Sequence, residues 1–348
     1  MKLKRQYFED IKLFRTTANM IWSVFLVIIL ISLPFFIKPY YLSVLNLMML
    51  NVIVALGLNL LVGNTGQISL GHAGFVAIGA YSGAFLLQSS IPFLPALLAA
   101  GLITALIGAF LGIPSLRLEG PYLSIVTLGF GLAVMVIIGR MEFFGGRTGM
   151  SVPRIGLEWT GMDYDTSLYY VFALTTVILV IAMVILLKSR IGRAFQAVRD
   201  SDIAASVIGI NVARYKTLSF AISAFYAGVA GGLWGLYLQF VTPGTFSFMM
   251  SIMFLATIVL GGLGSVTGSI MGAIVMTFLT LQLEEIVDIP LIGELIVSFS
   301  DNFMNPSGIA NIRWVFTGLI LIGVILFEPM GINGLWLRVK RYWRLWPF

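Results

Sequence analysis

The stretch LLVGNTGQISLGHAGFVAIGAY, residues 60–81, begins and ends like a membrane helix but is polar in its middle. The middle combines several glycines with two amide side chains, Asn64 and Gln67, and with His72, the single histidine of the chain. Backbone that leaves helical geometry inside a bilayer is tolerated only where protein or a water-filled cavity satisfies its polar groups. The stretch therefore predicts a helix that is broken at a functional place in a membrane protein.

The composition supports a location in lipid. The 348 residues are 59% hydrophobic and 10% charged, whereas soluble domains carry about 25% charged residues. The absence of cysteine excludes disulfides, thiolate catalysis and cysteine-based metal sites. A single histidine also argues against a histidine-based metal cluster, so we expect no metal site and no catalytic residues.

Apolar runs predict about ten membrane spans, and only helices account for them because the alternation of a membrane β-barrel is absent. The expected fold class is therefore an all-α integral membrane protein. We place the spans near residues 20–37, 41–62, 68–88, 92–113, 121–139, 167–187, 217–238, 248–262, 267–283 and 311–327.

The distribution of basic residues predicts the orientation. With the N-terminus in the cytoplasm, the inner segments hold sixteen of the 21 Lys and Arg residues. The outer loop 284–310 instead carries five acidic residues and no basic one. This pattern follows the positive-inside rule and places both termini in the cytoplasm. It also explains the net charge of +6 without a nucleic-acid partner.

The sequence shows no linker that would divide the chain, so we expect one transmembrane domain, residues 20–335. A basic cytoplasmic segment, 1–19, precedes it. The apolar run that follows this segment lacks a small-x-small cleavage site and is long enough to span, which favours an uncleaved first helix over a signal peptide. The basic and aromatic tail, 336–348, is typical of an anchor at the membrane surface, which makes membrane lipid an expected partner.

A second Gly-rich interruption resembles the first. LGGLGSVTGS, residues 260–269, repeats the G-x-x-G step of the first stretch and precedes another apolar run. Paired Gly-interrupted segments in the two halves of a transporter indicate its pathway, whereas single glycines also serve close helix packing. The expected path or hinge residues are Gly63, Asn64, Gly66, Gln67, Ser69, Gly71, His72, Gly261, Gly262, Gly264, Ser265 and Gly268.

The sequence allows two interpretations of the role of His72. A lone histidine inside a membrane helix can relay protons, but its apparent local helper is Ser69 and its span contains no carboxylate. We therefore expect a helix cap or an inter-helix hydrogen bond. An intramembrane Ser–His protease is rejected because the chain lacks G-x-S-G and G-x-S-x-G contexts.

The cytoplasmic segment 188–216 predicts two short helices that end near Gly209 and Asn211. It carries six basic residues, and its apolar residues recur at helical spacing, which is typical of a surface that docks into a groove of a partner. The alternative is an ordinary positive-inside loop. The expected apolar stripe comprises Ala194, Ala197, Val198, Ile203, Ala204, Val207 and Ile208.

Several blocks, in this order, resemble a known family: the permease subunits of bacterial ABC importers for branched-chain amino acids, of the LivM type. The resemblance runs through about residues 40–335, and the blocks are specific only together. They are GLNLLVGNTGQISLGHAGFVAIGAYSGA (57–84), RLEGPYLSIVTLGFG (117–131), GGRTGMSVP (145–153), SRIGRAFQAVRDSDIAASVIGIN (189–211), GGLGSVTGSIMGA (261–273) and EPMGINGL (328–335).

The resemblance implies a fold similar to that of type II ABC importer permeases, with Gly-broken helices. It implies three kinds of partner: two cytoplasmic ABC ATPases, a second permease chain of the LivH type, and a periplasmic or lipid-anchored solute-binding protein. The segment 188–216 would be the coupling element. The E-A-A-x-x-x-G pattern of such elements is matched by Ala204, Ala205 and Gly209, but Ile203 stands in place of Glu. The expected ATPase-coupling residues are Arg190, Arg193, Arg199, Ala204, Ala205 and Gly209.

The chain has no phosphate-binding G-x-x-x-x-G-K-[ST] loop, so we expect no bound cofactor here and ATP hydrolysis in partner chains. The expected function is branched-chain amino acid uptake across the bacterial inner membrane, powered by those ATPases. Alternatives are a related permease for urea, amides or sugars, a sodium-coupled transporter, and a passive channel for a small neutral solute. A membrane enzyme is disfavoured because no acid–base or nucleophile constellation is present.

Overall fold

The computed structural model describes residues 17–118, 120–155, 162–287 and 330–345, together with single positions between 318 and 328. Its contacts form two compact units, residues 1–255 and 256–348, and each is treated by itself. This division leaves open the prediction of a single domain over 20–335. The first sixteen residues and most of the expected outer loop 284–310 lie outside the described part of the chain.

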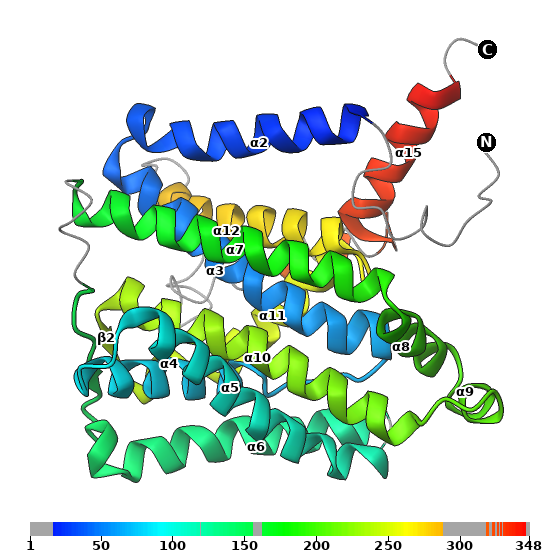
Figure 1. Cartoon of the computed structure of the whole chain (residues 1–348), viewed down its shortest axis with the longest axis horizontal. Coiled ribbons are helices and arrows are strands. Elements are labelled where there is room, and N and C mark those ends of the chain that lie inside the picture. Colours follow the sequence, from blue (N-terminus) through cyan, green and yellow to red (C-terminus); the bar gives the residue numbers. More distant parts are fainter. Residues whose placement is uncertain are drawn as a thin grey trace, which may run out of the picture. The chain divides into compact units, whose positions relative to one another are not determined.

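The described elements are almost all helices (Figure 1). In chain order they are α2 (Thr17–Phe36), α3 (Pro39–Asn59), the π-helical turn η1 (Leu60–Asn64), α4 (His72–Gln88), α5 (Phe93–Gly112), the 3₁₀ turn η2 (Pro114–Leu116), α6 (Pro121–Arg140), η3 (Glu142–Phe144), β1 (Met150–Ser151), α7 (Tyr164–Lys188), α8 (Arg190–Asp200), α9 (Asp202–Val207), α10 (Val212–Leu238), β2 (Phe240–Val241), η5 (Pro243–Thr245), α11 (Phe248–Gly261), α12 (Val266–Val287) and α15 (Gly331–Leu345).

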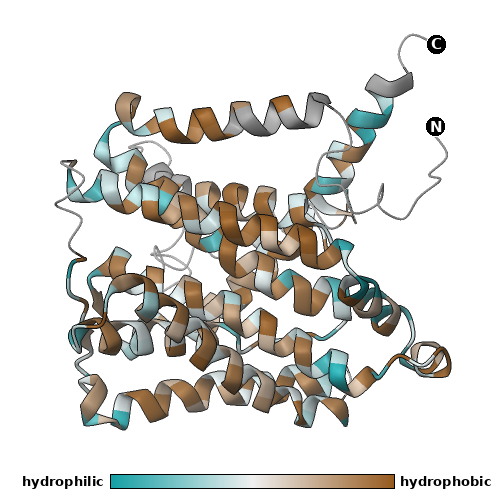
Figure 2. Ribbon diagram, in the orientation of Figure 1, coloured by the Kyte–Doolittle hydropathy of each residue, from teal (hydrophilic) through white to brown (hydrophobic). Residues whose placement is uncertain are grey.

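The prediction of an all-α membrane protein is confirmed. Six stretches of the described residues are long and apolar enough to cross a membrane, and two shorter apolar helices accompany them. Figure 2 shows apolar residues along the long helices and hydrophilic ones gathered on α8 and on part of α15. Large apolar side chains such as Leu106 and Phe110 are 72% and 74% exposed, which suits contact with lipid tails or with another membrane protein.

Helix α10 is the centre of the first unit and packs against α5, α4 and α3 (Figure 1). Glycines make the contact between α4 and α10 possible. A Cβ atom on Gly79 would lie 2.5 Å from Cα of Gly228, and one on Gly83 would lie 3.2 Å from Cα of Gly232. Small residues let membrane helices approach in this way and gain van der Waals contact between their backbones.

Helix α2 is attached to α7 at a proline. Pro34 has no N–H and cannot donate to the carbonyl of Leu30, four residues earlier. The hydroxyl of Tyr169 donates to that carbonyl at 2.9 Å, and Tyr170 donates to the carbonyl of Ile31 at the same distance. The two tyrosines thereby satisfy backbone groups at the point where the proline weakens the helix.

A short antiparallel pair joins the loop after α6 to the end of α10. Met150 and Ser151 pair with Val241 and Phe240, and the side chain of Gln88 donates to the carbonyl of Ser151 at 2.7 Å. The ends of α4 and α10 and this part of the expected outer loop 140–166 are therefore held together.

Candidate functional site

The predicted break in the first Gly-rich stretch is present. Helix α3 passes into the π-helical turn η1, and the chain is then unwound until α4 begins at His72. Gly66 has a φ of +72°, in the left-handed region that glycine adopts without strain. A π turn inside a helix frequently marks a functional position, so the first candidate site is this segment, residues 60–71, called the broken segment below.

Side chains of the broken segment satisfy the carbonyls that the break frees. Asn64 donates to the carbonyl of Asn59 at 3.3 Å, and Thr65 donates to the carbonyl of Leu61 at 2.6 Å. Gln67 donates to the hydroxyl of Ser219 in α10 at 2.8 Å. Asn64 and Thr65 therefore bind backbone groups that the break frees, and Gln67 fastens the segment to α10.

The start of α4 takes its hydrogen-bond partners from other helices. The N–H of Leu70 donates to Thr127 of α6 at 3.0 Å, and the N–H of Ala73 donates to Ser251 of α11 at 2.9 Å. Helix termini leave such N–H groups without partners inside the helix. Two hydroxyls from distant parts of the chain therefore hold the restart of the helix in place.

The hydrogen bond expected for His72 is not formed. Its ring is fully buried, and among the described residues neither ring nitrogen has a hydrogen-bond partner. The ring packs instead on Phe75, with 5.8 Å between the ring centroids. The hydroxyl of Ser69, also fully buried, likewise lacks a partner in the described chain. Because buried polar groups are normally paired, these atoms mark the segment as unusual.

Glycines around α4 serve close packing. A Cβ atom on Gly71 would lie 2.7 Å from the carbonyl carbon of Thr127, and one on Gly74 would lie 3.0 Å from Cα of Gly131. Such contacts leave no room for a methyl group. For Gly71, the packing explanation offered by the sequence is therefore supported, and the role of the residue in a path stays a prediction.

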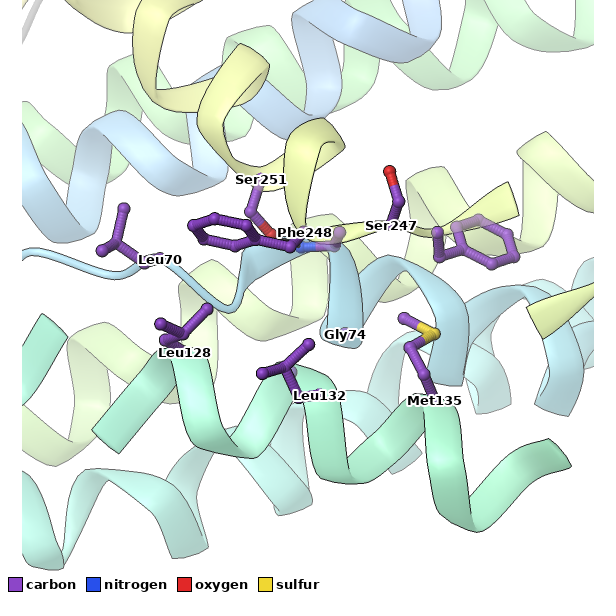
Figure 3. Close-up of a pocket in the computed structure, with 11 residues that line it drawn as sticks. Leu70, Gly74, Leu128, Leu132, Met135, Ser247, Phe248 and Ser251 are labelled. Carbon is purple, nitrogen blue, oxygen red and sulfur yellow. Dashed lines mark hydrogen bonds between the residues drawn. The ribbon is translucent and has the colours of Figure 1, made fainter. Parts of the chain in front are cut away.

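An apolar pocket lies beside the start of α4 (Figure 3). Its volume is about 10 Å³, which is room for about one water molecule. Leu128, Leu132 and Met135 point from α6 toward α4, and Phe248 and Ser251 approach from the opposite side (Figure 3). The lining is aliphatic and aromatic, with hydroxyls at one side, and the space is far smaller than the sites that hold small molecules.

The second Gly-rich stretch is also a break, between α11 and α12. Gly264 has a φ of +79°, close to that of Gly66, and Gly262 has a φ of +110°. Ser265 accepts a hydrogen bond from the N–H of Gly268 at 3.1 Å. The two stretches thus share a left-handed glycine at the end of the G-x-x-G step, but the second break is a tight turn.

The second break packs against the start of α15. A Cβ on Gly262 would lie 3.2 Å from Cβ of Asn333, whose side-chain oxygen accepts from Thr267 at 3.0 Å. A Cβ on Gly268 would lie 2.6 Å from the carbonyl oxygen of Gly261. Gly261 and Gly268 therefore serve packing, and the motif 328–335 is brought to the second break.

The cytoplasmic segment forms the two predicted short helices, α8 and α9. The hydroxyls of Ser189 and Ser201 cap them by accepting from the N–H groups of Ile191 and Ala204, which explains where each helix begins. Gly209 follows α9 with a φ of +84°. Asp202 forms an ion pair with Lys216, which is buried in the first turns of α10.

The segment also touches the broken segment. Arg199 of α8 donates from Nη1 to the carbonyl oxygen of Gly63 at 2.6 Å. A Cβ on Gly66 would meet the side chain of Arg199 at 3.6 Å. One basic side chain thus links the cytoplasmic helices with the π-helical end of α3.

The prediction of one continuous exposed apolar stripe is wrong for Ala194 and Val198. These two residues are buried because α8 packs against α7 and α10. The exposed apolar residues gather on and just after α9: Ile203, Val207 and Ile208 are 79%, 81% and 73% exposed. We call these three the α9 surface.

The expected coupling residues differ in their exposure to solvent. Ala205 is buried and offers no surface to a partner in this arrangement. The side chains of Arg190, Arg193, Arg199 and Ala204 are exposed, as is Gly209. Whether any of them contacts an ATPase stays a prediction.

In the described ranges, no group of three or more His, Asp or Glu residues is arranged to hold a metal ion. The sequence did not single out Thr127, Ser219, Ser251 or Asn333. Each is a single polar residue within an apolar helix or beside a Gly-rich turn, and nothing in the sequence says which distant backbone or side-chain group it binds.

Residues 40–325 match the protein family described as "Branched-chain amino acid transport system / permease component". The chain is 37% identical to the high-affinity branched-chain amino acid transport system permease protein LivM of Escherichia coli K12, over 75% of this chain and 68% of that protein. It is 26% identical to the probable branched-chain amino acid transport permease protein LivH of Methanocaldococcus jannaschii, over 83% and 90% of the two chains. No solved structure matches the chain.

Proposed function

Since the chain belongs to the permease component family of branched-chain amino acid transport systems, we propose that it forms part of the membrane path of an ABC importer for leucine, isoleucine and valine. The family and the similar proteins are transport permeases. The chain is accordingly a transport subunit and not an enzyme, and it is a multi-pass membrane protein.

The hydrogen bond from Arg199 to the carbonyl of Gly63 is the observation that carries the mechanism. A ligand shifts a conformational equilibrium only by its difference in affinity for the two states. ATP bound to a partner therefore acts on the path only through a physical connection. In our proposal, movement of α8 and α9 changes the Arg199 contact and thereby the broken segment.

The apolar pocket beside α4 supports the choice of substrate. In this arrangement it is too small for an aliphatic side chain. In our proposal the helices around it separate during transport, and an aliphatic side chain then contacts Leu128, Leu132 and Phe248. The partnerless hydroxyl of Ser69 lies one residue before Leu70, which lines the pocket. Polar groups of an amino acid that passes here would find hydrogen-bonding atoms near the start of α4. We propose Gly63, Asn64, Gly66, Gln67, Ser69, Gly71 and His72 as the path or hinge on this side, and the second break as its counterpart.

We propose two cytoplasmic ATPases as the partners of the α9 surface, since three large apolar residues on and just after α9 are exposed there. A second permease chain and a solute-binding protein complete the assembly, the latter docking on the outer loops 140–166 and 284–310. ATP is held by the ATPases, and this chain binds no cofactor. Both termini lie in the cytoplasm and the protein resides in the bacterial inner membrane.

The first experiment isolates the protein from its native membrane in mild detergent and identifies the co-purifying chains by mass spectrometry. The purified complex is then reconstituted in liposomes, and uptake of radiolabelled leucine is measured with ATP and the loaded binding protein. We expect two ATPases, a second permease and ATP-dependent uptake. Sodium-dependent uptake without ATP would contradict the proposal, as would equilibration of leucine across the membrane without any partner.

Val207→Asp tests the α9 surface. The residue is 81% exposed, so we expect the variant to fold, and a carboxylate placed in an apolar interface costs association energy because it loses water. Stimulation of ATPase activity by the loaded binding protein should fall at least about tenfold, equivalent to about 1.4 kcal/mol.

Gln196→Asp, which adds the same charge at an exposed position of α8, is the matched control. Equal losses in both variants would mean that charge, and not the α9 surface, is responsible. Normal stimulation in Val207→Asp would refute the assignment of this surface.

A further inference from the structure

A second cavity lies away from the apolar pocket, between the broken segment, the start of α6 and the cytoplasmic helices. Its volume is about 350 Å³ and it is open to solvent. This size falls within the range of about 300–1,000 Å³ that small-molecule sites occupy. Its walls come from the broken segment, from α8 and α9, from the start of α6 and from α10. The mechanism above moves α8 and α9 relative to the broken segment, so an occupant would contact the parts that move.

The charged residues of this cavity are Arg199, Asp202 and Lys216. Lys216 is paired with Asp202, so the guanidinium of Arg199 leaves the group with one net positive charge. Arg199 uses Nη1 for the Gly63 carbonyl and keeps its other donors. A guanidinium is suited to a carboxylate, which it binds through two parallel hydrogen bonds.

Asp202 supplies the opposite chemistry. Its Oδ2 atom is paired with Lys216, and its second carboxylate oxygen is an additional acceptor. The side chain of Asp202 is 31% exposed, so it is accessible from the cavity. A cationic ammonium group in the cavity would therefore bind to this second oxygen of Asp202.

The remaining wall is aliphatic. Leu118, Leu123, Val198 and Ile203 line the cavity together with the charged residues. Leu123 and Val198 are almost fully buried, so they form a firm apolar surface, whereas Ile203 lies at the mouth. An alkyl chain that covers these side chains would release water from them and gain the hydrophobic contribution of that area.

From these three features together we propose that this cavity is a cytoplasmic-side site for a zwitterionic amino acid with a branched aliphatic side chain. Arg199 binds its carboxylate, Asp202 binds its ammonium group, and the aliphatic wall holds its side chain. This inference rests on the proposed function, because it makes the transported molecule a ligand on the side where it is released.

Such a ligand would act on the transport cycle. It would contact α8, α9 and the broken segment at once, and a ligand stabilises the arrangement to which it binds in proportion to ln(1 + [L]/Kd). Leucine on the cytoplasmic side would therefore hold the chain in the arrangement described here. Accumulated product would slow further ATP-driven cycles.

The test uses the complete complex, purified with its partner chains and placed in lipid nanodiscs without ATP or binding protein. Binding of radiolabelled leucine is measured by equilibrium dialysis. We expect saturable binding, at least about tenfold stronger than that of three competitors: 4-methylvalerate lacks the ammonium group, 3-methylbutylamine lacks the carboxylate, and alanine lacks the branched chain. Absence of saturable binding up to about 10 mM would overturn the proposal. Equal binding of 4-methylvalerate would overturn the role of Asp202.

Two bulky substitutions locate the site. Leu118→Trp fills this cavity, and Leu132→Trp fills the apolar pocket beside α4. We expect leucine binding to weaken at least about tenfold in the first variant and to persist in the second. The reverse result would move the site to the other pocket and overturn the proposal. If Leu118→Trp does not fold, the competitor series on the unmodified complex still decides.

ATPase activity provides the functional readout. Leucine at ten times its measured Kd should lower the rate stimulated by the loaded binding protein at least about twofold, and an unchanged rate would overturn the effect on cycling. Uptake in liposomes separates this inference from the proposed function. Uptake without leucine binding at the cavity would refute the site alone, whereas binding without ATP-driven uptake would refute the importer.

Discussion

Replacing Arg199 with alanine removes the bond that links α8 to the carbonyl of Gly63, and its effect can be worked out from the structure. The bond is 2.6 Å long and partly buried. A hydrogen bond to a charged group contributes about 1.5–3 kcal/mol. The side chain of Arg199 is exposed, so screening by water reduces this to about 1–2 kcal/mol.

We take the bond to form in only one of the two conformations between which the transporter alternates. Losing about 1–2 kcal/mol in that conformation shifts the equilibrium constant between the two by about 5- to 30-fold. The assay is the ratio of ATPase rates with and without loaded binding protein in nanodiscs. We expect the ratio to fall by this factor in Arg199→Ala. Arg199→Lys should recover part of it, because lysine retains the charge but not the planar donors.

Arg214→Ala is the matched control. Arg214 has the same charge and is exposed at the other end of the cytoplasmic segment, where its backbone N–H donates to the side chain of Asn211. An unchanged ratio in Arg199→Ala would refute the connection through Gly63. Equal losses in Arg199→Ala and Arg214→Ala would show that overall charge is what matters.

Two further predictions concern packing in the two units. Gly79→Ala should destabilise the protein by about 1–3 kcal/mol, because the new Cβ would lie 2.5 Å from Cα of Gly228 and backbone cannot yield. Gly129→Ala, where no described atom lies within 4 Å of the new Cβ, is the control in thermal unfolding, and equal melting temperatures would contradict the close approach. Glu328→Gln removes the charge that binds Arg338 at 2.9 Å. Trypsin should then cut α15 several-fold faster in a timed digestion, and an unchanged rate would mean that the ion pair does not hold the helix.

The sequence predicts the helices well because a long apolar run in a membrane protein has few alternatives. The expected spans 121–139 and 248–262 end within one residue of α6 and α11. The expected span 68–88 begins too early, since residues 68–71 are unwound and α4 starts at His72. Hydropathy does not distinguish an apolar helix from an apolar extended segment that packs within protein.

The sequence does not predict which residues form hydrogen bonds with one another within the site. It indicates that a broken helix needs donors and acceptors, but not that Thr127 and Ser251 supply them. The prediction from the sequence that His72 forms a hydrogen bond was wrong. The N–H groups of Leu70 and Ala73 at the start of α4 already have partners in those two hydroxyls, so His72 is not required as a cap.

The close contact between α4 and α10 has a consequence for biosynthesis. Gly79 and Gly228 meet in the finished protein, yet about 150 residues of chain separate them. A ribosome adds about 5–20 residues per second, so α4 waits roughly 7–30 s before α10 emerges. During that interval its glycine face lacks its final neighbour, and the insertion machinery or lipid must cover it. Assembly of the first unit is therefore completed late, when α10 arrives between helices that are already in the membrane.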